Sequence, residues 1–328
     1  MNTKQAIANF LKVALTLLIL YFLYRQVAHH WQEIKAYEWE IHWGYMILSV
    51  IVGIGTFFVL SAVWLKIIAG FGHQLSITKA FRIFYLSNLG RYIPGKIWQL
   101  FGILYLTKKE GIPPERAGAS FVFSQMIGIP ASLLVFVLAA QIEPKLLVDQ
   151  VAVLGDKSAY LMTAAMVAVS LVMVLWPQKV LAVGNAVLRK LKRPQVIFTL
   201  DKKVALTIFV GYSVSWIMYG TAFWLFTRAV TNGVGCGLVA AVGAFIVAYQ
   251  IGYLALFAPG GFGPRELVLG VMLTPFLGPI APAVAIGARL WAIVIEGLAA
   301  LLALTEKVDA GRSTWQKRKK DLQHRRQK

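Results

Sequence analysis

The fold of this chain is decided by an interrupted apolar segment, residues 80–107, whose centre reads SNLGRYIPGKIWQ over residues 87–99. Pro94 removes a backbone donor and Gly95 permits a left-handed turn, so one continuous helix through this centre is disfavoured. Each apolar half has only about 10–13 residues, whereas a helix rising ~1.5 Å per residue needs roughly 20 residues to cross a bilayer. The segment therefore predicts two half-helices joined by a bend, a re-entrant hairpin.

A second apolar segment, residues 237–278, is broken in the same way further along the chain. It contains YQIGY at residues 249–253 and APGGFGPRE at residues 258–266. Backbone that leaves the helix at membrane depth is tolerated only where it is buried in protein or lines a water-filled cavity. The two breaks together predict an interior cavity or groove between two hairpins. The predicted bend residues are Pro94, Gly95, Pro259, Gly260 and Gly261.

Apolar runs of membrane-spanning length surround both segments. The chain of 328 residues is 58% hydrophobic and 14% charged, with a mean hydropathy of +0.67. Soluble domains are about 45–50% apolar and about 25% charged. We therefore expect an all-α polytopic integral membrane protein with about six spanning helices plus the two hairpins. The expected helices cover residues 5–28, 44–70, 117–140, 158–176, 204–229 and 281–304, the first being retained because no cleavage site follows it.

Positive charge is concentrated on one predicted face of the membrane. The net charge is +19, and an inside N-terminus places most of the 33 Lys and Arg residues in cytoplasmic loops and in the tail, residues 305–328. This distribution obeys the positive-inside rule. We therefore expect a protein of the bacterial inner (cytoplasmic) membrane with both termini in the cytoplasm. The basic stretches are typical of juxtamembrane segments that face anionic headgroups, and no nucleic-acid partner is expected.

The same topology makes the two hairpins start from opposite sides of the membrane. Broken helices at corresponding places in two halves of a chain are typical of inverted repeats, in which the half-helices meet near the midplane. We expect one transmembrane domain, residues 1–304, with candidate repeats at residues 44–176 and 204–304.

Charged residues within the predicted membrane region have two interpretations. A Lys or Arg at the bilayer centre costs at least about 2.5–3.5 kcal/mol, so these cations are expected to have partners. They either form internal salt bridges that lock the helices together, or form an electropositive pocket that binds a lipid phosphate. Under the second interpretation, the candidate phosphate ligands are Arg91, Lys96 and Arg265, and the residues that balance charge or gate the pocket are Glu266, Glu296 and Arg289.

Neutral polar residues in apolar surroundings are candidates for lining the cavity, although such residues also hold helices together. The single Cys236 excludes an internal disulfide, and the histidines lack zinc-ligand spacing. We expect no metal, no cofactor and no enzyme activity, with a membrane transferase that uses Glu266 or Glu296 as base as the remaining alternative. The candidate lining residues are Asn88, Gln99, Gln125, Tyr249 and Gln250.

The motifs GRYIPGK at residues 90–96 and PGGFGPRE at residues 259–266 carry a family resemblance. With them, the chain resembles the lysylphosphatidylglycerol synthase transmembrane-region family over nearly its whole length. In that family this region is flippase-like, and the bifunctional members move aminoacylated phosphatidylglycerol between leaflets. No soluble aminoacyl-transfer domain follows Leu304, so the chain looks like a stand-alone member. The matching residues are Arg91, Pro94 and Gly95 in the first motif and Pro259, Gly260, Gly261 and Glu266 in the second.

The resemblance implies a role in envelope lipid handling. The first hypothesis is a flippase-like protein that translocates or scrambles a phosphate-bearing lipid, either an anionic or aminoacylated phospholipid or a polyprenyl-phosphate-linked lipid. The alternative is a non-transporting membrane subunit that presents a lipid to a separate envelope glycosyltransferase or aminoacyltransferase. Only the first hypothesis predicts that the purified chain by itself exchanges lipid between leaflets.

Overall fold

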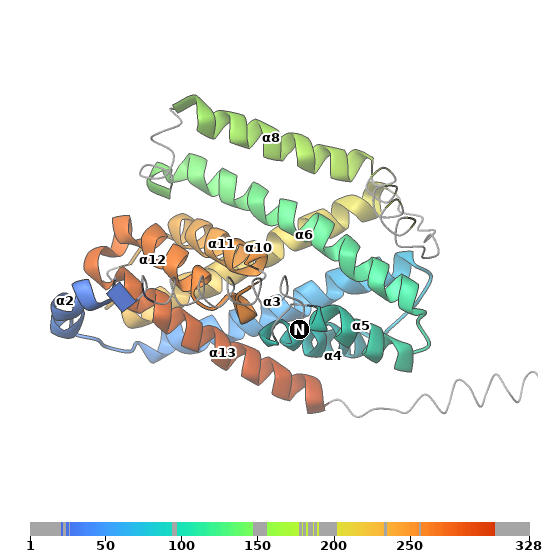
Figure 1. Cartoon of the computed structure of the whole chain (residues 1–328), viewed down its shortest axis with the longest axis horizontal. Coiled ribbons are helices and arrows are strands. Elements are labelled where there is room, and N and C mark those ends of the chain that lie inside the picture. Colours follow the sequence, from blue (N-terminus) through green and yellow to red (C-terminus); the bar gives the residue numbers. More distant parts are fainter. Residues whose placement is uncertain are drawn as a thin grey trace, which may run out of the picture.

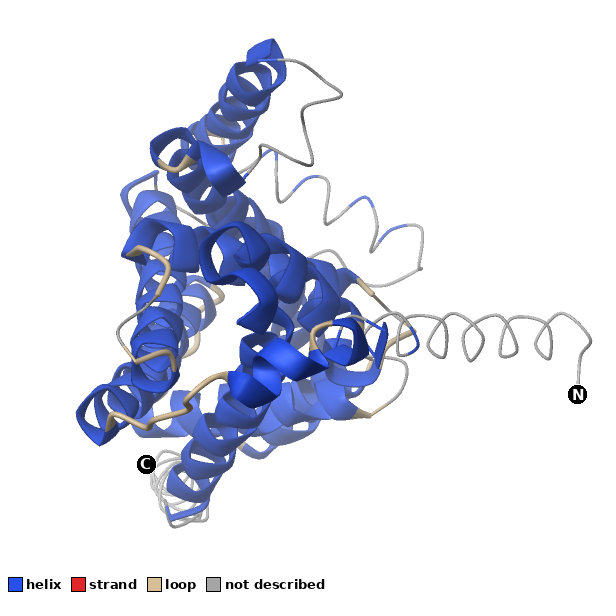
Figure 2. Cartoon of the chain, turned by 90° about the vertical axis from the view of Figure 1, so that its left-hand side faces the viewer, coloured by secondary structure: helices blue, strands red, loops and turns tan. Residues whose placement is uncertain are grey.

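Every regular element in the described part of the chain is a helix, as the composition predicts (Figures 1 and 2). Most of the first expected helix, residues 5–28, and the basic tail after residue 305 lie outside the described residues. The structure, a computed structural model, describes residues 27–93, 97–146, 156–176, 202–232, 235–255 and 257–305, together with single positions at residues 21, 24, 25, 179, 182, 186 and 189.

Four helical stretches among the described residues are long and apolar enough to cross a membrane. A fifth apolar helix, α11 (Leu238–Leu254), is shorter. Together they make the chain a multi-pass membrane protein, because lipid-exposed backbone must satisfy its own hydrogen bonds within helices. The four long stretches are α3 (Trp43–Gly70), α6 (Pro114–Ile142), α10 (Lys202–Val230) and Pro259–Thr305, which ends in α13 (Ala281–Thr305).

Two further elements lie at the edges of this assembly. The expected helix at residues 158–176 is present as α8 (Asp156–Leu175), which packs along α6 but is not among the four long apolar stretches (Figure 1). The short helix α2 (Trp31–Ala36) precedes α3, and the turn η2 (Pro144–Leu146) follows α6.

The helices α3 and α10 pack side by side and run antiparallel. At one end the His42 backbone N–H donates to the Ala229 carbonyl at 2.9 Å. Toward the other end, the Cα of Gly211 lies so close to Val63 that an added Cβ would meet its side chain at 2.5 Å. The absence of a side chain at Gly211 therefore allows the close approach of these two helices.

The helix α13 packs on the same part of α3 but runs parallel to it. Trp291 Nε1 donates to Ser49 Oγ at 3.0 Å, and four residues later along both helices Ile295 faces Gly53. The constant offset between these two contacts fixes the parallel direction. The long helices thus form a bundle in which α13 runs parallel to α3 and α10 runs antiparallel to it.

The first broken segment is a helical hairpin composed of α4 (Ile77–Asn88), the turn η1 (Leu89–Tyr92) and α5 (Trp98–Lys109). Near its tip, the Cα of Gly102 lies against Ser87, and at its base Lys79 Nζ contacts Glu110 Oε2 at 3.0 Å. The two half-helices therefore run antiparallel. The predicted bend residues Pro94 and Gly95, and Lys96 beside them, lie outside the described residues.

The base of this hairpin lies at the C-terminal end of α3. Arg116, in the first turn of α6, donates from Nη1 to the Phe71 carbonyl just after α3, at 3.0 Å. The same nitrogen lies 3.0 Å from His73 Nε2. Burial, and secondly the charge of Arg116, lower the pKa of His73 below its usual value, which favours a neutral ring that accepts from Arg116.

The second broken segment is also a hairpin, composed of α11, the turn η4 (Pro259–Gly261) and α12 (Pro264–Leu277). The predicted bend is present, and φ is positive at Gly260 (+59°), Gly261 (+74°) and Gly263 (+94°). Residues with a Cβ rarely adopt this conformation, so three glycines together allow the tight reversal.

The second hairpin starts from the opposite end of the bundle. Its base joins α10 on one side and, on the other, the turn η5 (Gly278–Ile280), which packs near α2 at the N-terminal end of α3. In Figure 1, α4 and α5 lie in the right half of the molecule, whereas α11 and α12 lie in the left half. The tips η1 and η4 contact each other inside the bundle.

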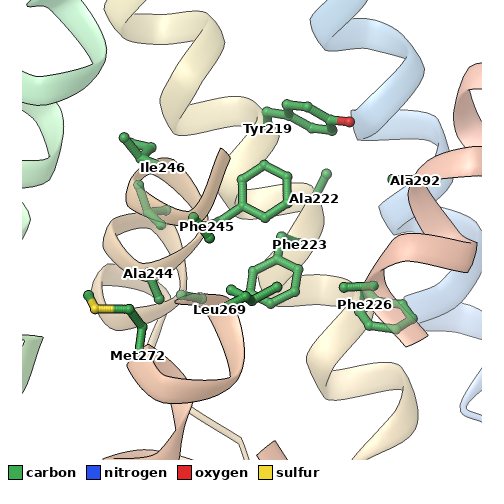
Figure 3. Close-up of a cluster of buried hydrophobic side chains, with 14 of the residues drawn as sticks. Tyr219, Ala222, Phe223, Phe226, Ala244, Phe245, Ile246, Leu269, Met272 and Ala292 are labelled. Atoms are coloured by element: carbon green, nitrogen blue, oxygen red, sulfur yellow. The ribbon is translucent and has the colours of Figure 1, made fainter. Parts of the chain in front are cut away.

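A cluster of buried aromatic side chains packs the second hairpin against the long helices. Phe223 and Phe245 are fully buried with ring centroids 4.9 Å apart, and Figure 3 shows both rings between Tyr219, Leu269 and Phe226. These side chains come from α10, α11 and α12. The site at the hairpin tips therefore rests on a rigid apolar base.

Candidate functional site

The hairpin tips meet at a cluster of buried charges. In the described part of the chain the buried charged side chains all belong to this cluster, and each is no more than 6% exposed. Such residues inside a membrane protein are expensive to bury and indicate a functional site. They are Arg91, Arg265, Glu266, Arg289 and Glu296.

The first ion pair joins the first hairpin to α13. Arg91, in the turn η1, forms a salt bridge through Nη2 with Glu296 Oε1 and donates from Nη1 to Tyr249 Oη at 2.6 Å. Glu296 also accepts from Tyr92 Oη at 2.5 Å, and its backbone carbonyl accepts from Tyr85 Oη at 2.8 Å. A buried carboxylate with these donors has its charge well compensated.

The second ion pair is looser and joins α12 to α13. Arg289 Nε lies 3.6 Å from Glu266 Oε1, and neither of these two atoms has a hydrogen-bond partner among the described residues. Glu266 accepts instead from the Gly263 backbone N–H at 2.6 Å, which caps the first turn of α12. Arg289 donates from Nη1 to the Gly260 carbonyl at 3.1 Å, so both residues hold the η4 turn in place.

Arg265 has no carboxylate partner in the described part of the chain. It is 5% exposed, and its Nη2 has no hydrogen-bond partner there. Its guanidinium carbon lies 5.0 Å from the ring centroid of Phe245 and 4.8 Å from that of Tyr249. Such cation–π contacts contribute about 2 kcal/mol when desolvated, but they do not neutralise the charge.

The position of Arg265 raises the local potential further. It is the second residue of α12, where the helix dipole is positive and backbone N–H groups lack intrahelical acceptors. A cation at this place is unfavourable by itself, whereas an anion bound beside it would be stabilised by both the guanidinium and the dipole. The geometry is suited to a phosphate oxygen.

A recess opens directly beside Arg265. It is narrow, with room for about one water-sized group. Two glycines contribute backbone instead of side chains: a Cβ on Gly252 would meet Arg265 at 2.8 Å, and one on Gly260 would meet Arg289 and Tyr92 at 2.8 Å. The residues that line the recess are Arg91, Tyr249, Gly252, Tyr253, Gly260 and Arg265.

A larger cavity with about 570 Å³ of empty space, its open side included, lies between the first hairpin and the long helices. It shares Tyr249 and Tyr253 with the recess. The five neutral polar residues singled out in the sequence all lie on its wall: Asn88, Gln99, Gln125, Tyr249 and Gln250.

The structure brings most of the sequence-derived candidates to one place. Lys96 lies outside the described residues, so its candidate role stays a prediction from the sequence. Sequence reasoning gave no role to Tyr92, Tyr253 or Gly263, which complete the site. Tyr253 follows Tyr249 by one helical turn, and this spacing is the signal that places both on one face of α11.

The described residues contain no cluster of His, Cys, Asp and Glu that could hold a metal ion.

A comparison with curated proteins finds no match. The model of the lysylphosphatidylglycerol synthase TM region family matches residues 9–303, and the chain therefore belongs to this family.

Proposed function

We propose that this chain translocates or scrambles a phosphate-bearing lipid between the two leaflets of a bilayer. The observation that carries the proposal is the buried Arg265, which lacks a counter-ion among the described residues and lies beside a recess. Membership of the lysylphosphatidylglycerol synthase TM region family supports a role in lipid modification or translocation. A lipid phosphate is the anion that reaches such a site from within a membrane.

Arg265 is the proposed primary phosphate ligand. Arg91 already has Glu296 and Tyr249 as partners, so it is proposed to contact phosphate only when its salt bridge opens. The loose pair of Glu266 and Arg289 is proposed to respond first to a bound anion, because it lacks a direct hydrogen bond. Lys96 remains a proposed third ligand on the sequence alone.

An inverted repeat is proposed as the basis of alternating access. The order helix, hairpin, helix occurs twice, from α3 to α6 and from α10 to α13, and the hairpin bases lie at opposite ends of the bundle. This supports repeats near residues 43–142 and 202–305, which would leave α8 outside the first repeat. Rocking one repeat against the other would then expose the recess to either side.

The remaining proposals concern the setting of the protein. We place it in the bacterial inner membrane with its basic face and both termini in the cytoplasm, following the positive-inside rule. In each half, the hairpin lets polar headgroups pass through protein while acyl or prenyl chains stay in lipid. Lipid transport is proposed to be either passive or driven by a proton gradient.

The test is leaflet exchange by the purified protein in vesicles that contain fluorescent phosphatidylglycerol or a short fluorescent polyprenyl phosphate. Wild-type protein is expected to make the inner-leaflet fluorophore accessible to an external quencher. Arg265→Met is expected to slow exchange by about tenfold to a hundredfold, because a charge-assisted hydrogen bond contributes ~1.5–3 kcal/mol. Arg265→Lys keeps the charge without the planar fork and is expected to lie between the two.

The matched control is Lys108→Met, which removes an exposed cation at the base of the first hairpin and is expected to leave exchange unchanged. A thermal unfolding curve for each variant establishes that it is folded. Absence of exchange of either lipid by folded wild-type protein would favour the alternative, a subunit that presents lipid to a separate transferase.

A further inference from the structure

The larger cavity beside the recess is polar but carries no charge. Its lining has no carboxylate, ammonium or guanidinium group among the described residues. It instead presents side chains that combine hydrogen-bond donors with acceptors. They are the amides of Asn88, Gln99, Gln125 and Gln250 and the hydroxyls of Ser124 and Tyr212.

One amide oxygen in this cavity wall has no partner. Gln250 is 4% exposed and donates from Nε2 to Ser132 Oγ at 2.7 Å, but its Oε1 has no hydrogen-bond partner among the described residues. A buried acceptor left unsatisfied costs about 1–3 kcal/mol. Because Gln250 lines the cavity, rotation of its amide toward a bound hydroxyl donor would remove this penalty.

The cavity adjoins the recess, since Tyr249 and Tyr253 line both spaces. Trp216 stands edge-to-face against Tyr249 with ring centroids 5.0 Å apart, and its Nε1 already donates to the Gly128 carbonyl at 3.2 Å. Trp216 therefore offers the cavity an apolar surface. Apolar walls with a few convergent polar groups are typical of small-molecule sites.

We infer that this cavity binds a neutral polyhydroxyl headgroup, a polyol or a sugar, that is esterified to the lipid phosphate. The inference rests on the proposed function, in which Arg265 holds that phosphate. An ammonium-bearing aminoacyl headgroup is disfavoured here, because it would lose its water without gaining a carboxylate partner. It would also lie beside the uncompensated charge of Arg265.

The experiment compares exchange of four fluorescent lipids by the full chain in vesicles. Phosphatidylglycerol and phosphatidylinositol carry neutral polyols on diacyl chains, a prenyl phosphoglucose carries a sugar on a prenyl chain, and lysyl-phosphatidylglycerol carries cations. At least one polyol or sugar lipid is expected to exchange about tenfold faster than lysyl-phosphatidylglycerol. Comparing the two diacyl lipids with the prenyl lipid then shows which kind of lipid carries the headgroup.

A variant assigns this preference to the cavity. Gln125→Glu places a carboxylate in the wall and is expected to reduce the preference about tenfold by admitting the cationic headgroup. Gln141→Glu, the same substitution on an exposed residue of α6 about 24 Å further along the helix, is expected to change nothing. Binding is measured separately from exchange, by competition of unlabelled short-chain lipids with a fluorescent lipid for the detergent-solubilised protein.

The outcomes separate this inference from the proposed function. Equal or faster exchange of lysyl-phosphatidylglycerol by wild-type protein would overturn the inference and leave lipid transport standing. A wild-type preference that Gln125→Glu leaves unaltered would overturn the assignment to this cavity. Exchange of none of the four lipids, with folded protein, would remove the proposed function and this inference with it.

Discussion

The two hairpins share one architecture but lie in different surroundings. On the second hairpin, Phe245 and Leu269 are no more than 1% exposed, whereas on the first Phe101 and Tyr105 are 52% and 62% exposed. The second hairpin has more buried residues, although Leu254 on it is 59% exposed, and the first packs on α3, α6 and α13 with its other face exposed. Two hairpins of one plan thus differ in how deeply they are buried.

The open face of the first hairpin is a shallow apolar groove. Trp98 and Phe101 lie on one wall and Leu86 and Leu89 on the other, with Gly90 between them. Gly90 is required by the packing of the hairpin itself, since a Cβ there would meet the Trp98 backbone at 2.6 Å. The first hairpin therefore depends on close approaches at Gly90 and Gly102, whereas the second also needs a turn of three glycines with positive φ.

The largest expected effect comes from Gly261→Ala in the enclosed turn. An added Cβ would lie 2.8 Å from the Gly252 carbonyl oxygen, at a φ of +74° that side chains rarely adopt. We expect loss of most folded protein, measured as the monodisperse fraction in size-exclusion chromatography and as the thermal midpoint.

The matched control is Gly111→Ala after the first hairpin, where φ is +76° but nothing lies within 4 Å of the added Cβ. Its expected loss of folding stability comes only from placing a Cβ at a positive φ and is about 1–2 kcal/mol. Equal losses for the two variants would contradict the tight enclosure of the second turn.

A smaller effect is expected from Glu296→Gln, which leaves the buried Arg91 without its carboxylate. Removing one partner of a buried pair costs roughly 3–5 kcal/mol, and the double variant Arg91→Met, Glu296→Met should recover much of that loss. Arg289→Met should cost less, since Glu266 keeps its bond from Gly263. Thermal midpoints of the single and double variants test the order, and a larger loss for Arg289→Met would reverse the assignment of the tight pair.

The smallest effect on stability is expected from single cysteines placed at the two hairpin bases. Lys108→Cys and Gly237→Cys are exposed positions, and nothing lies within 4 Å of a Cβ on Gly237. In a Cys236→Ala background, a membrane-impermeant thiol reagent should label them from opposite sides of the membrane. Labelling of both from one side would exclude the proposed inverted repeat.

The helical class and the two breaks could be read from the sequence because they depend on local chemistry. Apolar runs near Trp43–Gly70 and Lys202–Val230 have the length of a bilayer, and Pro259 with its two following glycines cannot continue a helix. The resemblance to the family, stated from the two motifs, is confirmed by the family match over residues 9–303.

The pairing of the buried charges could not be read from the sequence. Arg91 and Glu296 are separated by about two hundred residues in the sequence. From the sequence alone, Glu266 or Glu296 could pair with any of the buried arginines. Arg91 forms one of the internal salt bridges that the sequence left open as an alternative, and its role as a phosphate ligand stays a prediction.

The sequence by itself determined that this chain lies in a membrane, that its helices are interrupted twice, and that charges accompany each interruption. These properties follow from hydropathy, from the missing donor of proline and from the freedom of glycine, all of which act within a few residues. Only the tertiary structure decided that the two interruptions meet, that Glu296 neutralises Arg91, and that Arg265 is left beside a recess. Contacts between distant segments depend on how long helices pack, and packing is a property of the whole chain.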